Sequence, residues 1–224
     1  MTTGTGTRTG RRPAAPLVLA TALGTTALFA LLTALVVVGW SPLEHLDHRV
    51  VTGLTADVAT HPWLVDVLQG GTDGLSPWVF RVVVLAPVVV LLRRGEHRPA
   101  LWALLAVWGG GLLVAGLKVL VDRERPTLAD PISSAGGFSY PSGHALGATV
   151  GCAVLLALAW PHLGRRGRRV ATVSAVTVAG FVSFTRVALG VHFTSDVLAG
   201  ALLGLTWLAA VTLLVRPAPG GKPL

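Results

Sequence analysis

The sequence predicts an all-α membrane protein: a six-transmembrane-helix bundle with an amphipathic helical segment on its outer surface. Three observations predict this fold. Hydrophobic residues make up 52% of the 224-residue chain and charged residues only 12%, which is too apolar for an ordinary soluble domain. Apolar runs near the roughly 20 residues that a bilayer-spanning helix needs occur six times. Basic residues gather in alternate connections between these runs, as in a multi-pass protein.

The six runs are expected to form one helical domain. They are Leu17 to Trp40, Leu75 to Leu92, Pro99 to Val121, Ala145 to Trp160, Val170 to Phe184 and Asp196 to Val215. The first run follows three arginines, as a signal peptide would, but it is longer than a usual signal and is interpreted as a retained span. The predicted organisation is a disordered cytoplasmic tail at 1–16, a six-span membrane domain at 17–215 and a cytoplasmic tail at 216–224.

The segment between the first two runs, Ser41 to Ser76, is polar but keeps a helical apolar pattern. Its apolar residues recur at helical spacing among acidic, basic and histidine residues: Leu43, Leu46, Val50, Val51 and Leu54. This pattern predicts an amphipathic helix on the membrane surface. His45 and His48 could be metal ligands, but their place on the polar face favours a solvated role.

The basic residues give the expected orientation. Twelve of the 18 Lys and Arg residues fall on one side of the predicted bundle: Arg8, Arg11, Arg12, Arg93, Arg94, Arg98, Arg165, Arg166, Arg168, Arg169, Arg216 and Lys222. The positive-inside rule places this side and both termini in the cytoplasm. The net charge of +8 then reflects topology and contact with anionic membrane lipids, not binding to nucleic acid. The oligomeric state does not follow from the sequence.

The single cysteine, Cys152, lies inside the fourth run. One cysteine cannot form an intramolecular disulfide, and it gives no cysteine metal site. Cys152 is therefore expected to be a packing residue.

Phe138 to His144, reading Phe-Ser-Tyr-Pro-Ser-Gly-His, stands directly before the fourth run. Pro141 disfavours helical geometry at the residue before it, so Ser142 or Gly143 is expected to cap a new helix. The free N–H groups of a helix start attract anions, and His144 beside them can give a proton to a bound oxyanion. An ordinary loop-to-helix turn is the alternative.

A second polar cluster closes the third run, in Lys118 to Pro126. Lys118 lies about one helical turn inside the apolar region, where a cation is costly and marks a candidate site unless it reaches the surface. Arg125 follows seven residues later, so both cations share one face if the helix continues to Pro126. Such an ammonium and guanidinium pair is suited to clamping a phosphate.

A third polar cluster, Thr185 to Asp196, joins the fifth and sixth runs. His192 and Asp196 are four residues apart, so on a continuous helix they would face the same side and pair. A carboxylate that accepts one ring N–H leaves the other nitrogen free to act as a nucleophile. Asp196 can also cap the helix that begins here, and the two roles are compatible.

All three clusters fall on the predicted outer side. Three cations, two histidines, one carboxylate and a helix N-terminus together describe a phosphoryl-transfer site. No carboxylate cage for Mg²⁺ accompanies them, so the sequence predicts a metal-independent site without a cofactor.

The motifs Lys-x6-Arg-Pro, Pro-Ser-Gly-His and Arg-x5-His-x3-Asp, in this order, resemble the three signature motifs of the type 2 phosphatidic acid phosphatase superfamily. This resemblance implies that His192 attacks phosphorus to form a phosphohistidine, that Asp196 orients it and that His144 protonates the leaving oxygen. It also implies phosphoryl-binding roles for a further set, namely Lys118, Arg125, Ser142, Gly143 and Arg186. The third motif of the family usually begins Ser-Arg, whereas here it begins Thr185-Arg186.

The expected function is removal of a terminal phosphate from a lipid phosphate or diphosphate at the outer face of the cytoplasmic membrane. The six-span size resembles bacterial members acting on undecaprenyl diphosphate, phosphatidylglycerophosphate or phosphatidic acid, and the sequence does not choose among them. Specificity is expected from Ser41 to Ser76 and from Thr127 to Ser139. Two alternatives stay open: a phosphotransferase of the same superfamily and a non-catalytic membrane transporter. Vanadium haloperoxidases share the anion site but are soluble-type proteins.

Overall fold

The computed structural model describes residues 15–215, and this part of the chain contains helices and connections but no β-strand. The predicted tails lie outside it, apart from the last two residues of the first tail, which begin the first helix. The elements are α1 Ala15–Val37, α2 Ser41–Ala59, α3 Pro62–Gly74, α4 Pro77–Arg93, α5 His97–Val121, α6 Gly143–Ala159, η1 Trp160–His162, α7 Arg165–Ala188 and α8 Thr194–Leu214.

Five helical segments are long and apolar enough to cross a membrane: α1, α5, α6 with η1, α7 and α8. The sixth span forms only when α3 and α4 are taken together across a bend of 41°. The predicted second span, Leu75 to Leu92, therefore covers only the α4 part of a broken span, because α4 alone has 17 residues. With this pair included, the predicted all-α six-span bundle is confirmed.

The predicted fifth span was too short. Helix α7 begins at Arg165, not at Val170, and it has 24 residues. The arginines of the expected inner connection form its first turns, because arginine is a good helix former and a polar helix end can extend beyond the apolar layer.

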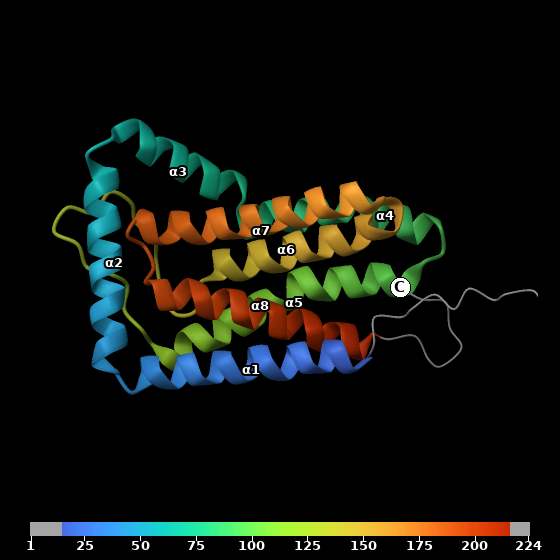
Figure 1. The fold of residues 1–224 in the computed structure, drawn as a ribbon, viewed down its shortest axis with the longest axis horizontal. Helices are drawn as coiled ribbons and strands as arrows, with labels where there is room; N and C mark the ends of the chain where they lie inside the picture. Colours follow the sequence, from blue (N-terminus) through green and yellow to red (C-terminus); the bar gives the residue numbers. More distant parts are fainter. Residues whose placement is uncertain (1–14, 216–224) are drawn as a thin grey trace, which may run out of the picture.

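Helix α2 crosses one end of the bundle, nearly perpendicular to the spanning helices (Figure 1). Its buried residues follow a helical stripe with spacings of four, four and three: Asp47, Val51, Thr55 and Val58. His45 and His48 lie off this stripe and are exposed, and the ring of His48 contacts the ring of Phe193. This confirms the amphipathic helix that the pattern predicts, with the difference that the outer segment contains a second helix, α3, which turns back toward the bundle.

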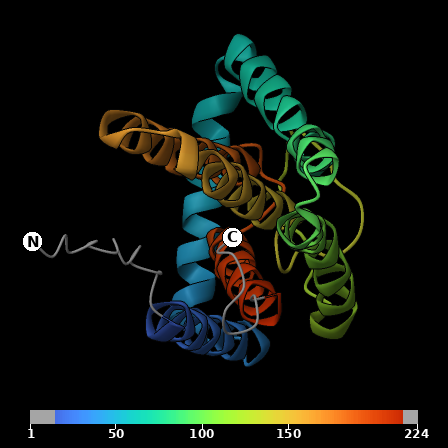
Figure 2. The same cartoon turned by 90° about the vertical axis from the view of Figure 1, so that its right-hand side faces the viewer.

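The core lies among α4, α5, α6 and α8, where apolar side chains such as Val84, Ala103 and Val150 are buried. Helix α1 packs along α8 on one side of this core (Figure 2). Cys152 is buried beside Phe80 and Val182, as expected of a packing residue.

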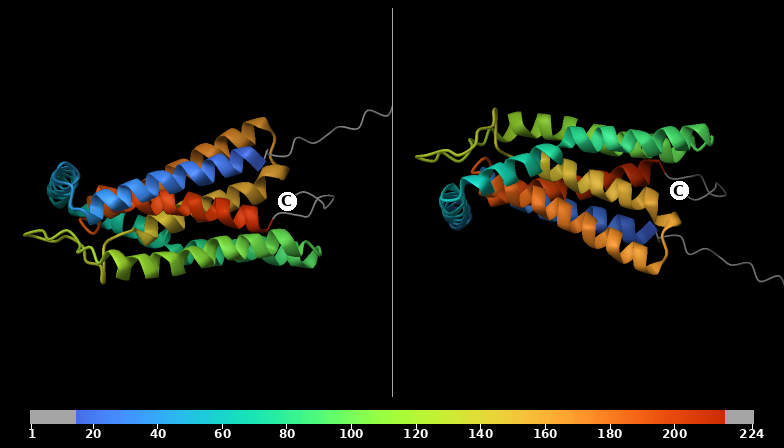
Figure 3. Two further views of the ribbon diagram at one scale, coloured as in Figure 1. Left: turned by 90° about the horizontal axis from the view of Figure 1, so that it is seen from below. Right: turned by 90° about the horizontal axis from the view of Figure 1, so that it is seen from above.

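The helices approach most closely near the start of α6. A Cβ atom added at Gly200 of α8 would lie 2.3 Å from the Ser142 carbonyl oxygen, so only glycine fits there. The connection 122–142, the turn 189–193 and helix α2 all gather at this same end, while the start of α1 and the end of α8 lie at the other (Figure 3). The end near Ser142 therefore contains all three polar clusters.

Candidate active site

The Pro-Ser-Gly-His motif forms the start of α6. Ser142 is the N-cap, and its Oγ accepts the N–H of Ala145 at 3.4 Å, which confirms the predicted helix start. The Ser142 N–H donates to the Asp196 carbonyl oxygen at 3.0 Å, so the first turn of α6 is fixed beside α8. The N–H groups of the first helical residues, Gly143 and His144, have no acceptor within a helix and can receive an anion.

Helix α5 ends earlier than the sequence predicts. Its last residue is Val121, and Asp122 adopts a left-handed conformation with φ of 51° that turns the chain out of the helix. The expectation that the helix continues to Pro126 is therefore wrong. Lys118 lies in the last turn of α5 and donates from Nζ to the Phe138 carbonyl oxygen, so its ammonium faces the 122–142 connection instead of extending to the surface.

Arg125 reaches the site through this connection and not along a helix face. Its guanidinium donates to four carbonyl oxygens, those of Gly136 at 3.0 Å, Gly137 at 2.8 Å, Phe138 at 3.3 Å and Val191 at 2.6 Å. Nη1 of Arg125, which donates to Val191, also lies 3.3 Å from Nε2 of His192. Burial lowers the pKa of Arg125 from its ordinary value. One guanidinium thus links the 122–142 connection to the turn that carries His192.

His192 lies in the turn between α7 and α8, so the predicted continuous helix through His192 and Asp196 is wrong. The predicted pair nevertheless forms, because α8 begins at Thr194 and presents the Asp196 carboxylate back toward the turn. His192 Nδ1 lies 3.3 Å from Asp196 Oδ2, and the same oxygen accepts the Phe193 N–H at 2.9 Å. Asp196 therefore both caps α8 and contacts the imidazole, as the sequence allows.

The hydrogen-bond network assigns the tautomer of His192. Asp196 can only accept at Nδ1, so Nδ1 carries the hydrogen and Nε2 presents its lone pair toward Arg125. Burial lowers the pKa of His192 to about 4, and the neighbouring carboxylate opposes this shift only in part. At neutral pH the ring is thus uncharged, which is the form that a nucleophilic imidazole needs.

Arg186, in the last turn of α7, is only 6% exposed. Its Nη1 contacts Thr72 Oγ1 at 3.4 Å, and its Nε has no hydrogen-bond partner in the described part of the chain. A buried guanidinium N–H without an acceptor is costly, and a phosphoryl oxygen would satisfy it. The neighbouring Thr185 donates its hydroxyl to Val182 in its own helix at 2.7 Å, so that hydroxyl is turned away from the anion.

His144 is the second residue of α6 and is half-buried. It lies close enough to Arg186 and Arg125 for their positive charges to act on its ring. The structure thus brings together all eight residues of the predicted site: Lys118, Arg125, Ser142, Gly143, His144, Arg186, His192 and Asp196. Within residues 15–215, no group of three or more His, Cys, Asp and Glu residues is arranged to hold a metal ion.

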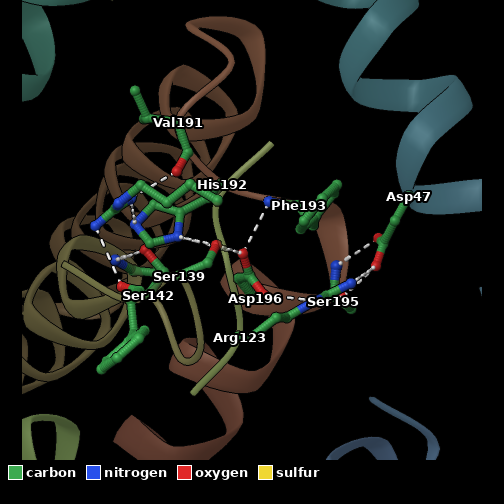
Figure 4. A network of polar contacts seen from close by, with 12 residues as sticks. Asp47, Arg123, Ser139, Ser142, Val191, His192, Phe193, Ser195 and Asp196 are labelled. Atoms are coloured by element: carbon green, nitrogen blue, oxygen red, sulfur yellow. Dashed lines mark hydrogen bonds and ion pairs between the residues drawn. The ribbon is translucent and has the colours of Figure 1, made fainter. Parts of the chain in front are cut away.

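The sequence predicted no role for four further residues of the polar network that includes Asp196, namely Asp47, Arg123, Ser139 and Ser195 (Figure 4). Ser139 donates from Oγ to Asp196 Oδ2, and Arg123 donates from Nη1 to Asp196 Oδ1 at 2.7 Å. A sequence signal existed for Asp47, because it is the one charged residue on the apolar stripe of α2. Ser139 and Ser195 carry no comparable signal.

Comparison with known proteins gives consistent matches. The family model of the PAP2 superfamily matches residues 99–218. The chain is 33% identical over 147 residues to phosphatidylglycerophosphatase B of Bacillus subtilis (strain 168), a match that covers 64% of this chain and 71% of that protein. It is 38% identical over 79 residues to an undecaprenyl-diphosphatase of Sulfolobus acidocaldarius, covering 35% of this chain and 34% of that protein.

A solved structure shares the whole architecture. The crystal structure of the transmembrane PAP2-type phosphatidylglycerolphosphate phosphatase from Bacillus subtilis superimposes with a TM-score of 0.76 at 26% identity. The superposition covers 87% of this chain and 95% of that one. The likeness therefore extends well beyond the residues that the family model matches.

Proposed function

The chain belongs to the PAP2 superfamily, and from this premise we propose that it is a membrane lipid phosphatase that works through a phosphohistidine at His192. One observation carries the proposal: Nδ1 of His192 faces the Asp196 carboxylate, and Nε2 faces Arg125. This is the arrangement of an imidazole that attacks an anion bound by cations. A transporter without catalysis would not need this pair.

The reaction proceeds in two steps at one phosphate pocket. The phosphoryl oxygens bind the cations and the start of α6, with contacts from Lys118, Arg125, Ser142, Gly143 and Arg186. His192 Nε2 attacks phosphorus, the bond to the lipid oxygen breaks, and His144 gives its proton to that oxygen. Water then attacks the phosphohistidine and passes a proton to His144, which releases phosphate and restores His192. Asp196 keeps its hydrogen bond to Nδ1–H throughout and stabilises the charge that forms on the ring.

Charge stabilisation in this mechanism comes from the protein. Arg125 faces Nε2 of His192, and Lys118 and Arg186 lie close enough to Arg125 for the three charges to interact, so developing charge on the phosphoryl oxygens meets preorganised donors. We therefore predict that a chelator leaves activity intact and that vanadate, which mimics pentacoordinate phosphorus, inhibits it. Loss of activity in EDTA with recovery in Mg²⁺ would contradict this mechanism.

Among lipid phosphates, we propose phosphatidylglycerophosphate as the first substrate to test. The support is that phosphatidylglycerophosphatase B is the relative matched over the larger share of this chain. Purified protein in detergent is given phosphatidylglycerophosphate, undecaprenyl diphosphate and phosphatidic acid, and inorganic phosphate is measured. The highest kcat/KM is expected for the first lipid, with no release by His192→Ala. A preference for another lipid would overturn the choice of substrate, and release by His192→Ala would overturn the mechanism.

The protein is a multi-pass membrane protein, and we propose that its active site faces outward in the cytoplasmic membrane. Support comes from the basic residues, which lie mostly at the end opposite the site. In a Cys152→Ala background, Ser134→Cys on the 122–142 connection should react with an impermeant maleimide in intact cells, and Gly164→Cys before α7 should not. The reverse labelling pattern would overturn this orientation.

A further inference from the structure

A chain of buried polar groups connects the surface helix α2 to the imidazole of His192 (Figure 4). Asp47 of α2 has no exposed surface. It accepts the Ser195 N–H at 2.9 Å, the Ser195 hydroxyl, and Nη2 of Arg123 at 2.9 Å. Arg123 uses its other terminal nitrogen for Asp196, at 2.7 Å, and Asp196 in turn contacts His192. The chain runs from α2 to the predicted nucleophile without a gap.

We propose that Asp47 and Arg123 are positioning residues for phosphoryl transfer, and that α2 sets the orientation of the Asp196 carboxylate through them. This proposal rests on the proposed phosphohistidine mechanism. It gives α2 a part in the chemical step, beyond covering the end of the bundle.

The contacts of Asp196 explain why Arg123 matters. Oδ2 is shared by three donors, from Ser139, Phe193 and His192. Oδ1 faces Arg123 alone within the described residues. The plane of the carboxylate, and with it the direction in which His192 is held, therefore depends on the Arg123 contact.

The contacts of Arg123 explain why Asp47 matters. A guanidinium is a rigid planar fork, so fixing one nitrogen fixes the other. Asp47 fixes the Nη2 side, and the guanidinium carbon lies 4.3 Å from the ring centroid of Phe193, the residue next to His192. Asp47 also accepts both donors of Ser195, so it holds the first turn of α8, which carries Asp196. Both terminal nitrogens of Arg123 are therefore linked to the first turn of α8. Nη1 binds Asp196 directly, and Nη2 binds Asp47, which holds Ser195.

Two substitutions test the proposal, each with a matched control. Asp47→Asn keeps the shape but replaces one acceptor with a donor, and Arg123→Lys keeps the charge but loses the fork. Asp57→Asn and Arg49→Lys make the same changes at exposed positions of α2. Arg123→Lys also serves as the second variant if Asp47→Asn does not fold, because it leaves both carboxylates with a cation.

The readout separates positioning from folding. Equilibrium binding of inorganic phosphate counts active sites and reports the phosphate pocket, and rapid quench with a ³²P-labelled substrate gives the rate of phosphoenzyme formation per site. We expect this rate to fall roughly 10- to 100-fold in both variants, the scale for a misplaced reacting group, with the affinity for inorganic phosphate unchanged. The double variant should be no slower than the slower single one, because both act through one chain of contacts. Both controls should match the wild type.

Three results would overturn the positioning role. A wild-type rate per active site in both variants, even with a lower melting temperature, would leave the link purely structural. Parallel loss of affinity for inorganic phosphate would place these residues in the phosphate pocket instead. A wild type that forms no phosphoenzyme would overturn the proposed function and the positioning role with it, and this result is visible without any variant.

Discussion

Helix α7 carries arginines at both ends, and these arginines differ in their exposure to solvent. At its start, Arg165, Arg166 and Arg169 are exposed. At its other end, Arg186 is 6% exposed, and its Nε has no acceptor among residues 15–215. Because burying an unpaired cation is costly, the first group fits a role in orientation at a membrane surface and Arg186 fits a role in binding an anion.

The histidines follow the same division. His162, beside the exposed arginines, lies at the surface, whereas His192 is 2% exposed and contacts Asp196 and Arg125. The side chain types are the same at the two ends of the bundle. What differs is whether neighbouring groups fix the side chain and remove it from water.

The largest expected difference between the two ends is in turnover. His192→Ala should lower kcat by at least ~10³-fold, because the nucleophile is lost. His162→Ala should stay within about 2-fold of wild type, as exposed substitutions usually do. Phosphate release from a lipid phosphate measures both. Comparable losses in the two variants would remove the distinction between the ends.

His144→Ala should affect substrates according to their leaving group. With lipid alkoxides, which need a proton as they leave, the loss should be about 10²-fold or more. With an aryl phosphate or a diphosphate the loss should be much smaller, because the leaving oxygen is already stable as an anion. The comparison of kcat/KM for the two substrate classes checks this. Equal losses would assign His144 a role other than general acid.

Arg186→Ala and Arg166→Ala compare the two ends of α7 directly. Arg186→Ala should lower kcat/KM by about 10²-fold and weaken inhibition by vanadate, because a preorganised donor to the phosphoryl group is lost. Arg166→Ala should change neither quantity measurably. A large effect of Arg166→Ala on the purified protein would show that the end of the bundle away from His192 also contributes to catalysis.

Close packing at the active-site end of the bundle should appear as a difference in stability between two glycine substitutions. Gly200→Ala places a Cβ 2.3 Å from the Ser142 carbonyl oxygen and should lower the free energy of unfolding by about 1–3 kcal/mol. Gly180→Ala, at an exposed site of α7 with open space, should raise it by up to about 1 kcal/mol through helix propensity. Denaturation in detergent compares them. A harmless Gly200→Ala would mean that α6 and α8 are less tightly packed.

The smallest effect is a shift in titration. Burial lowers the pKa of His192 to about 4, so the folded protein binds a proton there only as the pH falls toward that value. Between the ordinary histidine pKa of about 6.5 and 4, the ring stays neutral and competent for attack. NMR of ¹³C-labelled histidine, with the resonance assigned by loss in His192→Gln, measures the midpoint. A midpoint above 6 would contradict the burial argument.

The sequence predicted the six-span architecture and the residues of the candidate site, because membrane spans and motifs are local patterns. It predicted two local geometries wrongly. Lys118 and Arg125 do not share a helix face, since α5 ends at Val121, and His192 precedes α8 instead of lying on it. In both cases a loop brings the residues together, and helical spacing cannot describe a loop.

The network around Asp47 was missed for a different reason. Asp47 pairs with Arg123 across 76 residues of sequence, and one sequence offers no pattern for such a distant contact. The sequence shows only that an acidic residue lies on the apolar stripe of α2, and such a residue needs a buried partner. Which cation would supply it followed only from the path of the 122–142 connection.

The central claim is that the end of the bundle that contains the three polar clusters forms a covalent phosphoenzyme at His192. Rapid quench with ³²P-labelled substrate tests it most directly. We predict a phosphoprotein that is labile in acid and stable in alkali, with the phosphate on His192 by peptide mapping, and no label in His192→Ala. Label that persists in His192→Ala, or a wild type that turns over substrate without any labelled protein, would contradict the claim.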